Sequence, residues 1–397
     1  MFGLPGFPVV AAVLILAASA SSQEPDRPLP DRLVVDPSDL TNYPPDLRPN
    51  IEGMRVSSAL RATMEFVGQD LGYTIGDGWR TNEAFPFFMG TFGEAFEFRW
   101  YHKPGAAVDP ERPYSFGNLS GRLRACLGAA GFGCEVLERP QRGEAAGGAF
   151  TPEALRKQIV ASIAGRSLPV LLLDVPRPDR VLLATGYDQS GAVLIGWGLE
   201  GGDDRGIDFA PDKRREFADW AQQATAVVLL TGRGPRKEEG PAYRAALEQA
   251  VVLLRERERG HELTGAATFE NCARLLADQA LNAADPQTAQ RRVGILHPLI
   301  WDLATRRHYA NLFLTRAVKL RPQAGEELQA AAALFRAEHD MMWEIMRLAG
   351  GEFPGGDLPK LGDPQVRARI AEVILKARDK DLEAADHIEA ALKALHG

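Results

Sequence analysis

The sequence predicts an α+β protein in which helices and an antiparallel sheet are followed by an all-helical second half. Four short runs rich in valine and leucine, each bounded by glycine, proline or aspartate, lie between residues 168 and 232. From Pro241 onward, long segments rich in alanine, leucine, arginine and glutamate follow one another without a strand pattern. Helices followed by a closely connected antiparallel sheet are typical of an α+β domain, and the second half is typical of a bundle of five or six helices.

Three helices are predicted ahead of the strands. The first covers residues 54–72, where apolar residues recur at helical spacing and Ser57 or Ser58 can cap the start. The second covers residues 119–130. The third has Thr151 as its N-cap, with proline at the first helical position.

The four predicted strands cover residues 168–175, 180–188, 192–198 and 225–232. A tight turn at residues 189–191 joins the middle two into a hairpin. Sequential strands joined by short connections pair antiparallel, so we expect one antiparallel sheet.

The 397 residues are enough for two domains, which we expect at residues 51–235 and 241–397. Residues 1–20 read as a secretory signal peptide, and residues 21–50 as a proline-rich linker or extended arm. The apolar stretch of the signal is short for a membrane span. We therefore expect an exported protein, periplasmic or extracellular, with no transmembrane span in the mature chain. An uncleaved anchor is the alternative.

Charge and motifs exclude several function classes. The formal net charge is −7 and the pI is near 5.7, so nucleic acid is not an expected partner. The glycine pattern at residues 196–201 is followed by loop residues rather than a helix, so it does not predict a dinucleotide site. The histidines of the second half lack the repeated E-x-x-H spacing of a metal-binding bundle. No cofactor and no metal are expected.

The chain contains three cysteines. Export would allow a disulfide between Cys126 and Cys134, and Cys272 would then be a lone buried thiol. No C-x-x-C pair is present, which excludes a zinc site of the usual spacing.

Three features in order carry a family resemblance: "SSALRATMEFVGQDLGY" with "FMGTFGEAFEFRW", then "LPVLLLD" with "DRVLLATGYDQSGAVLIGW", then the helical second half. This order resembles bacterial proteins similar to the N-terminal domain of butirosin biosynthesis protein H. They belong with the papain-like superfamily, which includes the bacteriocin-processing cysteine peptidases. The resemblance spans residues 51–232 and implies a papain-like first domain.

Papain-like chemistry needs a cysteine at the start of the first core helix, a histidine at the start of a central strand, and an orienting residue on the next strand. Residues 54–59 contain no cysteine. Arg180 stands where the histidine would be, and arginine cannot act as a base near neutral pH. Gly196 and Trp197 stand where the orienting residue would be. The resemblance therefore implies a papain-like fold without its catalytic residues.

The aromatic stretch at residues 85–101 is expected to be mainly core, or else one wall of a ligand groove. Six residues on this stretch and on the hairpin are candidates for ligand binding: Glu94, Arg99, Trp100, Arg180, Tyr187 and Trp197. The expected function is non-catalytic binding of a peptide or small ligand, or of an exported partner protein. One alternative is an active cysteine peptidase or an acyl or aminoacyl transferase. Another is a structural periplasmic helper that acts through its helical second half.

Overall fold

The structure is a computed structural model of the 397-residue chain. It describes residues 29–35, 54–68, 84–100, 118–140, 150–176, 180–198, 213–234, 239–260, 262–282, 284–285, 287–289, 296–351 and 358–395. The expected signal peptide and most of the expected linker lie outside these residues. Among the helices that these residues form, none combines the length and apolar character needed to cross a membrane.

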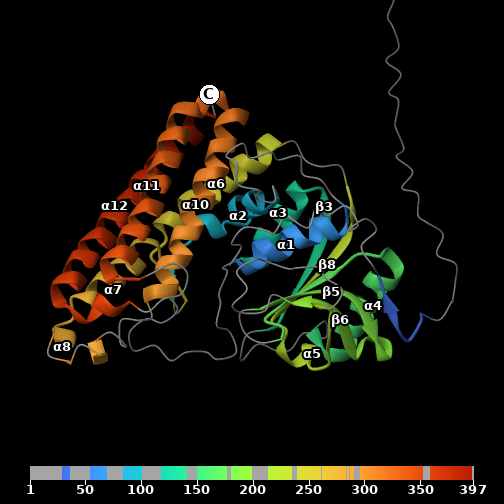
Figure 1. Ribbon diagram of the computed structural model, residues 1–397. Coiled ribbons are helices and arrows are strands. Elements are labelled where there is room, and N and C mark those ends of the chain that lie inside the picture. The colour runs from blue at the N-terminus through green and yellow to red at the C-terminus, as the bar shows by residue number, and fades with distance from the viewer. Residues whose placement is uncertain are drawn as a thin grey trace, which may run out of the picture. The chain divides into compact units, whose positions relative to one another are not determined.

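Seven strands of the described chain form one antiparallel sheet (Figure 1). Their bounds are β1 Leu33–Val34, β3 Phe132–Glu138, β4 Val170–Leu173, β5 Val181–Asp188, β6 Val193–Gly198, β7 Arg215–Phe217 and β8 Ala226–Arg233. The order is β3-β8-β4-β5-β6-β7, and β1 pairs with the end of β5. The four predicted strands are confirmed as β4, β5, β6 and β8. Strand β1 comes from the expected linker, so part of that segment packs on the sheet as an extended arm.

Helices cover both faces of this sheet. On one face lie α1 Arg55–Phe66 and α3 Leu119–Ala129, and α2 Ala84–Phe92 packs against both of these helices. Two belong to the other: α4 Pro152–Arg166 and α5 Trp220–Gln223. Side chains alternate along β5, so Leu183 joins the first core and Leu182 the second. This mixture of helices and antiparallel strands confirms the α+β fold class.

The helix starts test the predicted caps. Thr151 caps α4 as expected, because its hydroxyl accepts a hydrogen bond from the Ala154 amide at 3.2 Å. The predicted cap of α1 is wrong. The helix begins about one turn before Ser58, after Met54, whose side chain makes no capping bond. Ser57 and Ser58 therefore lie inside the first turn of α1. The group that caps α1 comes instead from a residue distant in sequence, which is described below.

The second half forms helices α6 Glu239–Arg255, α7 Gly265–Leu276, α8 Gln279–Asn282, α10 Leu296–Leu320, α11 Gly325–Ala349 and α12 Pro364–Ala394. The three longest, α10, α11 and α12, pack side by side (Figure 1). The expectation that this half contains no strand is wrong. Strands β9 (Glu258–Arg259) and β10 (Glu262–Thr264) form a small sheet with β2 (Arg99–Trp100). Strands of two or three residues are too short to show an alternating pattern in the sequence.

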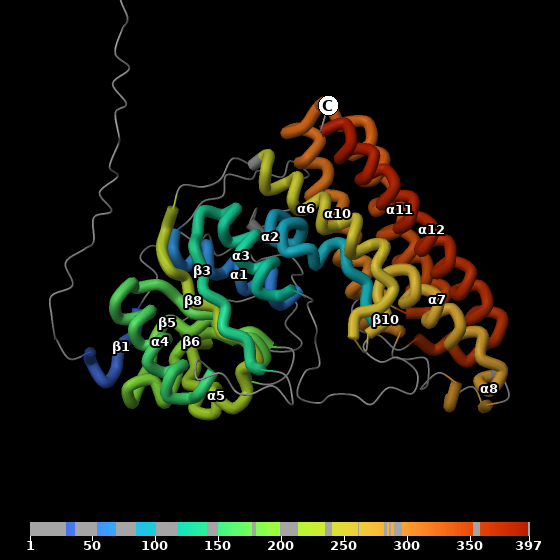
Figure 2. Tube along the Cα trace, turned by 180° about the vertical axis from the view of Figure 1, so that it is seen from behind, coloured from blue at the N-terminus to red at the C-terminus, as the bar shows by residue number. Residues whose placement is uncertain are grey.

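The expected boundary at residues 235–241 marks the change from strands to helices, but it does not separate two hydrophobic cores. Helix α2 packs against α1 on one side and α10 on the other, as Figure 2 shows. The Phe85 ring meets the Tyr309 ring edge-on at 4.6 Å between centroids, and Phe96 lies between Phe313 and Phe335. The aromatic stretch is therefore core, as expected, and this core joins the two halves of the described chain.

Candidate functional site

A buried carboxylate lies at the start of α1. Glu94 accepts hydrogen bonds from the Ser57 amide at 2.9 Å and from the Ser57 hydroxyl at 2.5 Å, both to the same oxygen, Oε2. Both side chains are buried. The first amides of a helix have no partner within the helix, and their dipoles favour a negative charge. Glu94 therefore caps α1 from a different part of the chain.

The turn that holds Glu94 is fixed by side chains from three helices. We call residues 92–97, which include the short 3₁₀ helix η2 (Glu94–Phe96), the Phe92–Glu97 turn. The Phe92 carbonyl, at the end of α2, accepts from Arg122 Nε at 2.7 Å and from Gln249 Nε2 at 3.0 Å. The carbonyls of the next residues accept from α10, as Arg306 Nη1 donates to Glu94 O and Arg307 Nη1 to Ala95 O.

Cationic donors suit this turn, because the carbonyl end of a helix is the negative end of its dipole. Gly93 takes a left-handed conformation there, with φ of 91°, and a Cβ at this position would lie 2.5 Å from Gln249 Nε2. Only glycine fits both the backbone angle and the approach of α6.

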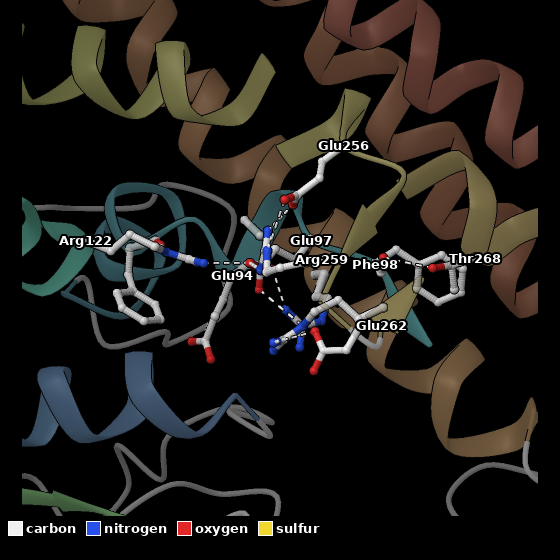
Figure 3. A network of polar contacts seen from close by, with 12 residues as sticks. Glu94, Glu97, Phe98, Arg122, Glu256, Arg259, Glu262 and Thr268 are labelled. Carbon is white, nitrogen blue, oxygen red and sulfur yellow. Dashed lines mark hydrogen bonds and ion pairs between the residues drawn. The ribbon is translucent and has the colours of Figure 1, made fainter. Parts of the chain in front are cut away.

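Glu97 is the centre of the charge network next to this turn (Figure 3). Its Oε1 accepts from Arg122 Nη1 at 2.6 Å and from Arg259 Nη1 at 2.9 Å. Its Oε2 lies 3.5 Å from Arg99 Nε. Burial favours the neutral acid, but the guanidinium groups of Arg122, Arg99 and Arg259 outweigh it and hold the pKa of Glu97 well below its usual value. Glu97 is therefore a permanent carboxylate.

The network continues into the β9–β10 hairpin of the second half. Arg259 also pairs with Glu256, and Arg99 Nη1 lies 3.9 Å from Glu262 Oε2. Thr268, in the first turn of α7, donates to the Phe98 carbonyl at 3.2 Å. In Figure 3 these residues flank Glu97, and the Glu94 side chain points away from them toward α1. The network thus joins β2 and α3 of the first half to β9, β10 and α7 of the second.

The structure brings together only some of the predicted ligand-binding residues. Glu94 and Arg99 both belong to the surroundings of the Phe92–Glu97 turn, and Trp100 follows them on β2, half-buried against the second-half core. Both Glu94 and Arg99 are buried and paired with protein groups, so neither faces a groove.

The other three candidates belong to the large sheet. Arg180 is half-buried just before β5, and its carbonyl accepts from the Asp174 amide. Trp197 is only 2% exposed and packs in the same core as α1, with Arg214 over its ring at 4.9 Å. Tyr187 packs in the core of the opposite sheet face, with α4 and α5. Trp197 and Tyr187 therefore cannot line one groove.

The expected disulfide is not present: Cys126 and Cys134 are free thiols. The Cys126 thiol lies within the core and makes a contact of 3.3 Å with the Leu123 carbonyl, which directs it inward from α3. Burial raises the pKa of Cys134 to about 11 and that of Cys272 to about 12, and burial together with the neighbouring Cys134 raises the pKa of Cys126 further. A nucleophilic cysteine needs a stabilised thiolate, and none of these three environments provides one.

The charged residues of this site therefore hold the Phe92–Glu97 turn and the start of α1 in place. Among the described residues, no group of histidine, cysteine and acidic side chains could hold a metal ion. Sequence reasoning found Glu94 and Arg99 but missed the residues that hold them: Glu97, Arg122, Gln249, Arg259, Arg306 and Arg307. One signal was available, because two glutamates and one arginine at residues 94–99 interrupt a strongly aromatic stretch and so predict buried ion pairs. Their partners lie up to 212 residues away in sequence, and no local pattern identifies them.

Comparison with protein-family models and with curated protein sequences gives no match to this chain.

Proposed function

We propose that this protein is an exported, non-catalytic member of the papain-like superfamily that acts by binding a peptide or a partner protein. The single observation that carries the proposal is the contact between Ser57 and Glu94. A papain-like enzyme places its nucleophile at the start of the first core helix, where the helix dipole stabilises a thiolate. In this chain a serine stands there, and a carboxylate from another turn already occupies the end of the helix.

Two further observations support a non-catalytic role. A carboxylate beside a nucleophile opposes formation of a second negative charge, so Glu94 disfavours an alkoxide or thiolate at this position. Arg180 lies at the start of β5, where the base is expected, and it stays protonated. Because Glu94, Arg99, Tyr187 and Trp197 are all buried, these residues do not support a small-ligand groove.

Activity probes test this proposal. A thiol-reactive peptide probe and a serine-reactive fluorophosphonate probe would be applied to the folded full chain, followed by mass spectrometry of the labelled peptides. We expect each probe to label the wild type no more than it labels a sample of the Ser57→Ala variant that has been denatured and refolded. Labelling of Ser57 that is lost in Ser57→Ala would make Glu94 its general base and would overturn the proposal. Labelling of a cysteine that is lost in the matching Cys→Ala variant would do the same.

A further inference from the structure

Three charged side chains meet in the interior of the helical half, one from each long helix. Arg307 of α10 donates to Glu338 Oε2 of α11 at 3.1 Å and to Asp381 Oδ2 of α12 at 2.5 Å. Arg307 and Glu338 are completely buried, and Asp381 is 2% exposed. The Arg307 guanidinium also lies 5.4 Å from the centroid of the Phe335 ring. Water therefore does not screen these charges.

The charges in this group do not balance. One guanidinium faces two carboxyl groups, and its Nη1 donates to the Ala95 carbonyl at 2.8 Å. Arg307 and Asp381 are the charged groups that face Glu338 from α10 and α12, while η2 presents only that carbonyl. The neighbouring His339 is held elsewhere, between the Ala304 carbonyl and the indole of Trp343. An unpaired charge in such a site is strongly unfavourable, so two ionised carboxylates are disfavoured.

The two carboxyl groups also bind neighbouring nitrogens of one guanidinium, Glu338 Oε2 at Nε and Asp381 Oδ2 at Nη2. Their other oxygens, Glu338 Oε1 and Asp381 Oδ1, are buried and have no hydrogen-bond partner among the described residues. A proton on one carboxyl group would supply a donor that two carboxylates lack. Burial raises the pKa of Glu338 well above its usual value, and the neighbouring Asp381 adds to this shift while Arg307 opposes it.

We propose that Glu338 keeps a proton in the folded protein and that this proton makes the contact between the three long helices and the Phe92–Glu97 turn sensitive to pH. When the proton is lost, the two carboxylates repel each other across the α11–α12 interface and compete for Arg307. Arg307 also holds Ala95, and the adjacent Glu94 caps α1 through Ser57. Loss of the proton therefore weakens a continuous series of contacts from α12 to the start of α1.

The sign of the effect follows from the direction of the pKa shift. The folded protein keeps the proton on Glu338 at pH values where the unfolded chain has lost it, so the folded state binds one more proton in that range. Stability from this group is complete below the ordinary pKa of a glutamic acid and is lost as pH rises toward the pKa of folded Glu338. In that window the ratio of folded to unfolded protein falls by up to about tenfold per pH unit.

The Glu338→Gln variant tests the proposal, because its amide imitates the protonated acid at every pH. Urea denaturation of the full chain would be measured from about pH 5 to about pH 9, a range that spans the ionisation of a carboxyl group with a raised pKa. We expect the stability of the wild type relative to Glu338→Gln to fall with pH by up to about tenfold per unit in the folded-to-unfolded ratio. The matched control is Asp340→Asn, on the same helix, whose exposed carboxylate pairs with Arg336. This control should leave the pH dependence of the wild type unchanged.

Two direct measurements keep the proposal testable if Glu338→Gln does not fold. The infrared band of a protonated buried carboxyl group should be present in the wild type at neutral pH and in Asp340→Asn, and absent from Asp381→Asn. Hydrogen exchange at the Ser57 amide should accelerate with pH more in the wild type than in Asp381→Asn, compared at equal pH. Absence of the infrared band from the wild type at neutral pH would overturn the proton on Glu338. Parallel pH profiles of the wild type and Glu338→Gln would overturn the pH-sensitive contact.

Discussion

The ring of Phe313 lies directly on the backbone of Gly90, so that a Cβ at Gly90 would be 2.2 Å from the ring. Gly90 belongs to α2 in the first half of the chain and Phe313 to α10 in the second. No side chain separates the two helices at this point. The close approach places Phe313 within the core that joins the two halves, where its ring also stacks on Tyr243 at 4.4 Å between centroids.

Replacing Gly90 by alanine is therefore expected to destabilise the protein by about 2 kcal/mol or more, because a methyl group cannot enter without moving Phe313. The matched control is Gly165→Ala in α4, where a Cβ would meet nothing within 4 Å. Alanine favours the helical backbone over glycine, so this control should stabilise by about 0.5 to 1 kcal/mol. Urea denaturation measures both. Equal effects of the two substitutions would contradict the close packing of α2 on α10.

The Ser57→Ala substitution is expected to destabilise by about 1.5 to 3 kcal/mol, because it removes a hydrogen bond to a buried carboxylate. The control is Ser120→Ala in α3, whose hydroxyl donates to Glu138 over the same distance, 2.5 Å, in an exposed position. Its effect should be below about 0.5 kcal/mol, because water replaces the lost partner. The two variants compare one chemical contact in two environments. A Ser57→Ala variant as stable as Ser120→Ala would mean that the buried hydroxyl bond to Glu94 does not stabilise the start of α1.

The lowered pKa of Glu97 predicts that the protein loses stability in acid. Its folded pKa is lowered, so its contribution is complete above the ordinary glutamic acid pKa of about 4.5 and is lost as pH falls below that value. Glu97→Gln should destabilise by about 3 kcal/mol or more at neutral pH, because it leaves the buried guanidinium of Arg122 without its carboxylate partner. The difference from the wild type should shrink as pH falls from about 5 to about 3.

Denaturation of both proteins over this pH range measures the effect. Glu135→Gln, on an exposed position of β3, serves as the control and should change stability by less than about 0.5 kcal/mol throughout. A difference between Glu97→Gln and the wild type that stays constant with pH would contradict the assignment of Glu97 as a permanent carboxylate.

Much of the fold was predictable because its signals are local. The apolar runs of β4, β5, β6 and β8 carry their own strand pattern, and Thr151 followed by proline carries its own helix start. The start of α1 was not predictable in the same way, because its capping group is Glu94 of a later turn. The β9–β10 strands were missed because they are only two and three residues long, and β10 pairs on its other side with β2, which precedes it by more than 150 residues.

The sequence by itself determined that this protein has helices and an antiparallel sheet followed by a helical half, and it favoured a core position for the aromatic stretch. Each conclusion depends on the types and spacing of residues that are close together in the sequence. Only the tertiary structure decided that the two halves share a core, that Glu94 caps α1, and that Arg307 faces two carboxyl groups. The reason is physical: a buried charge is stable only with a partner, and folding alone determines which distant side chain that partner is.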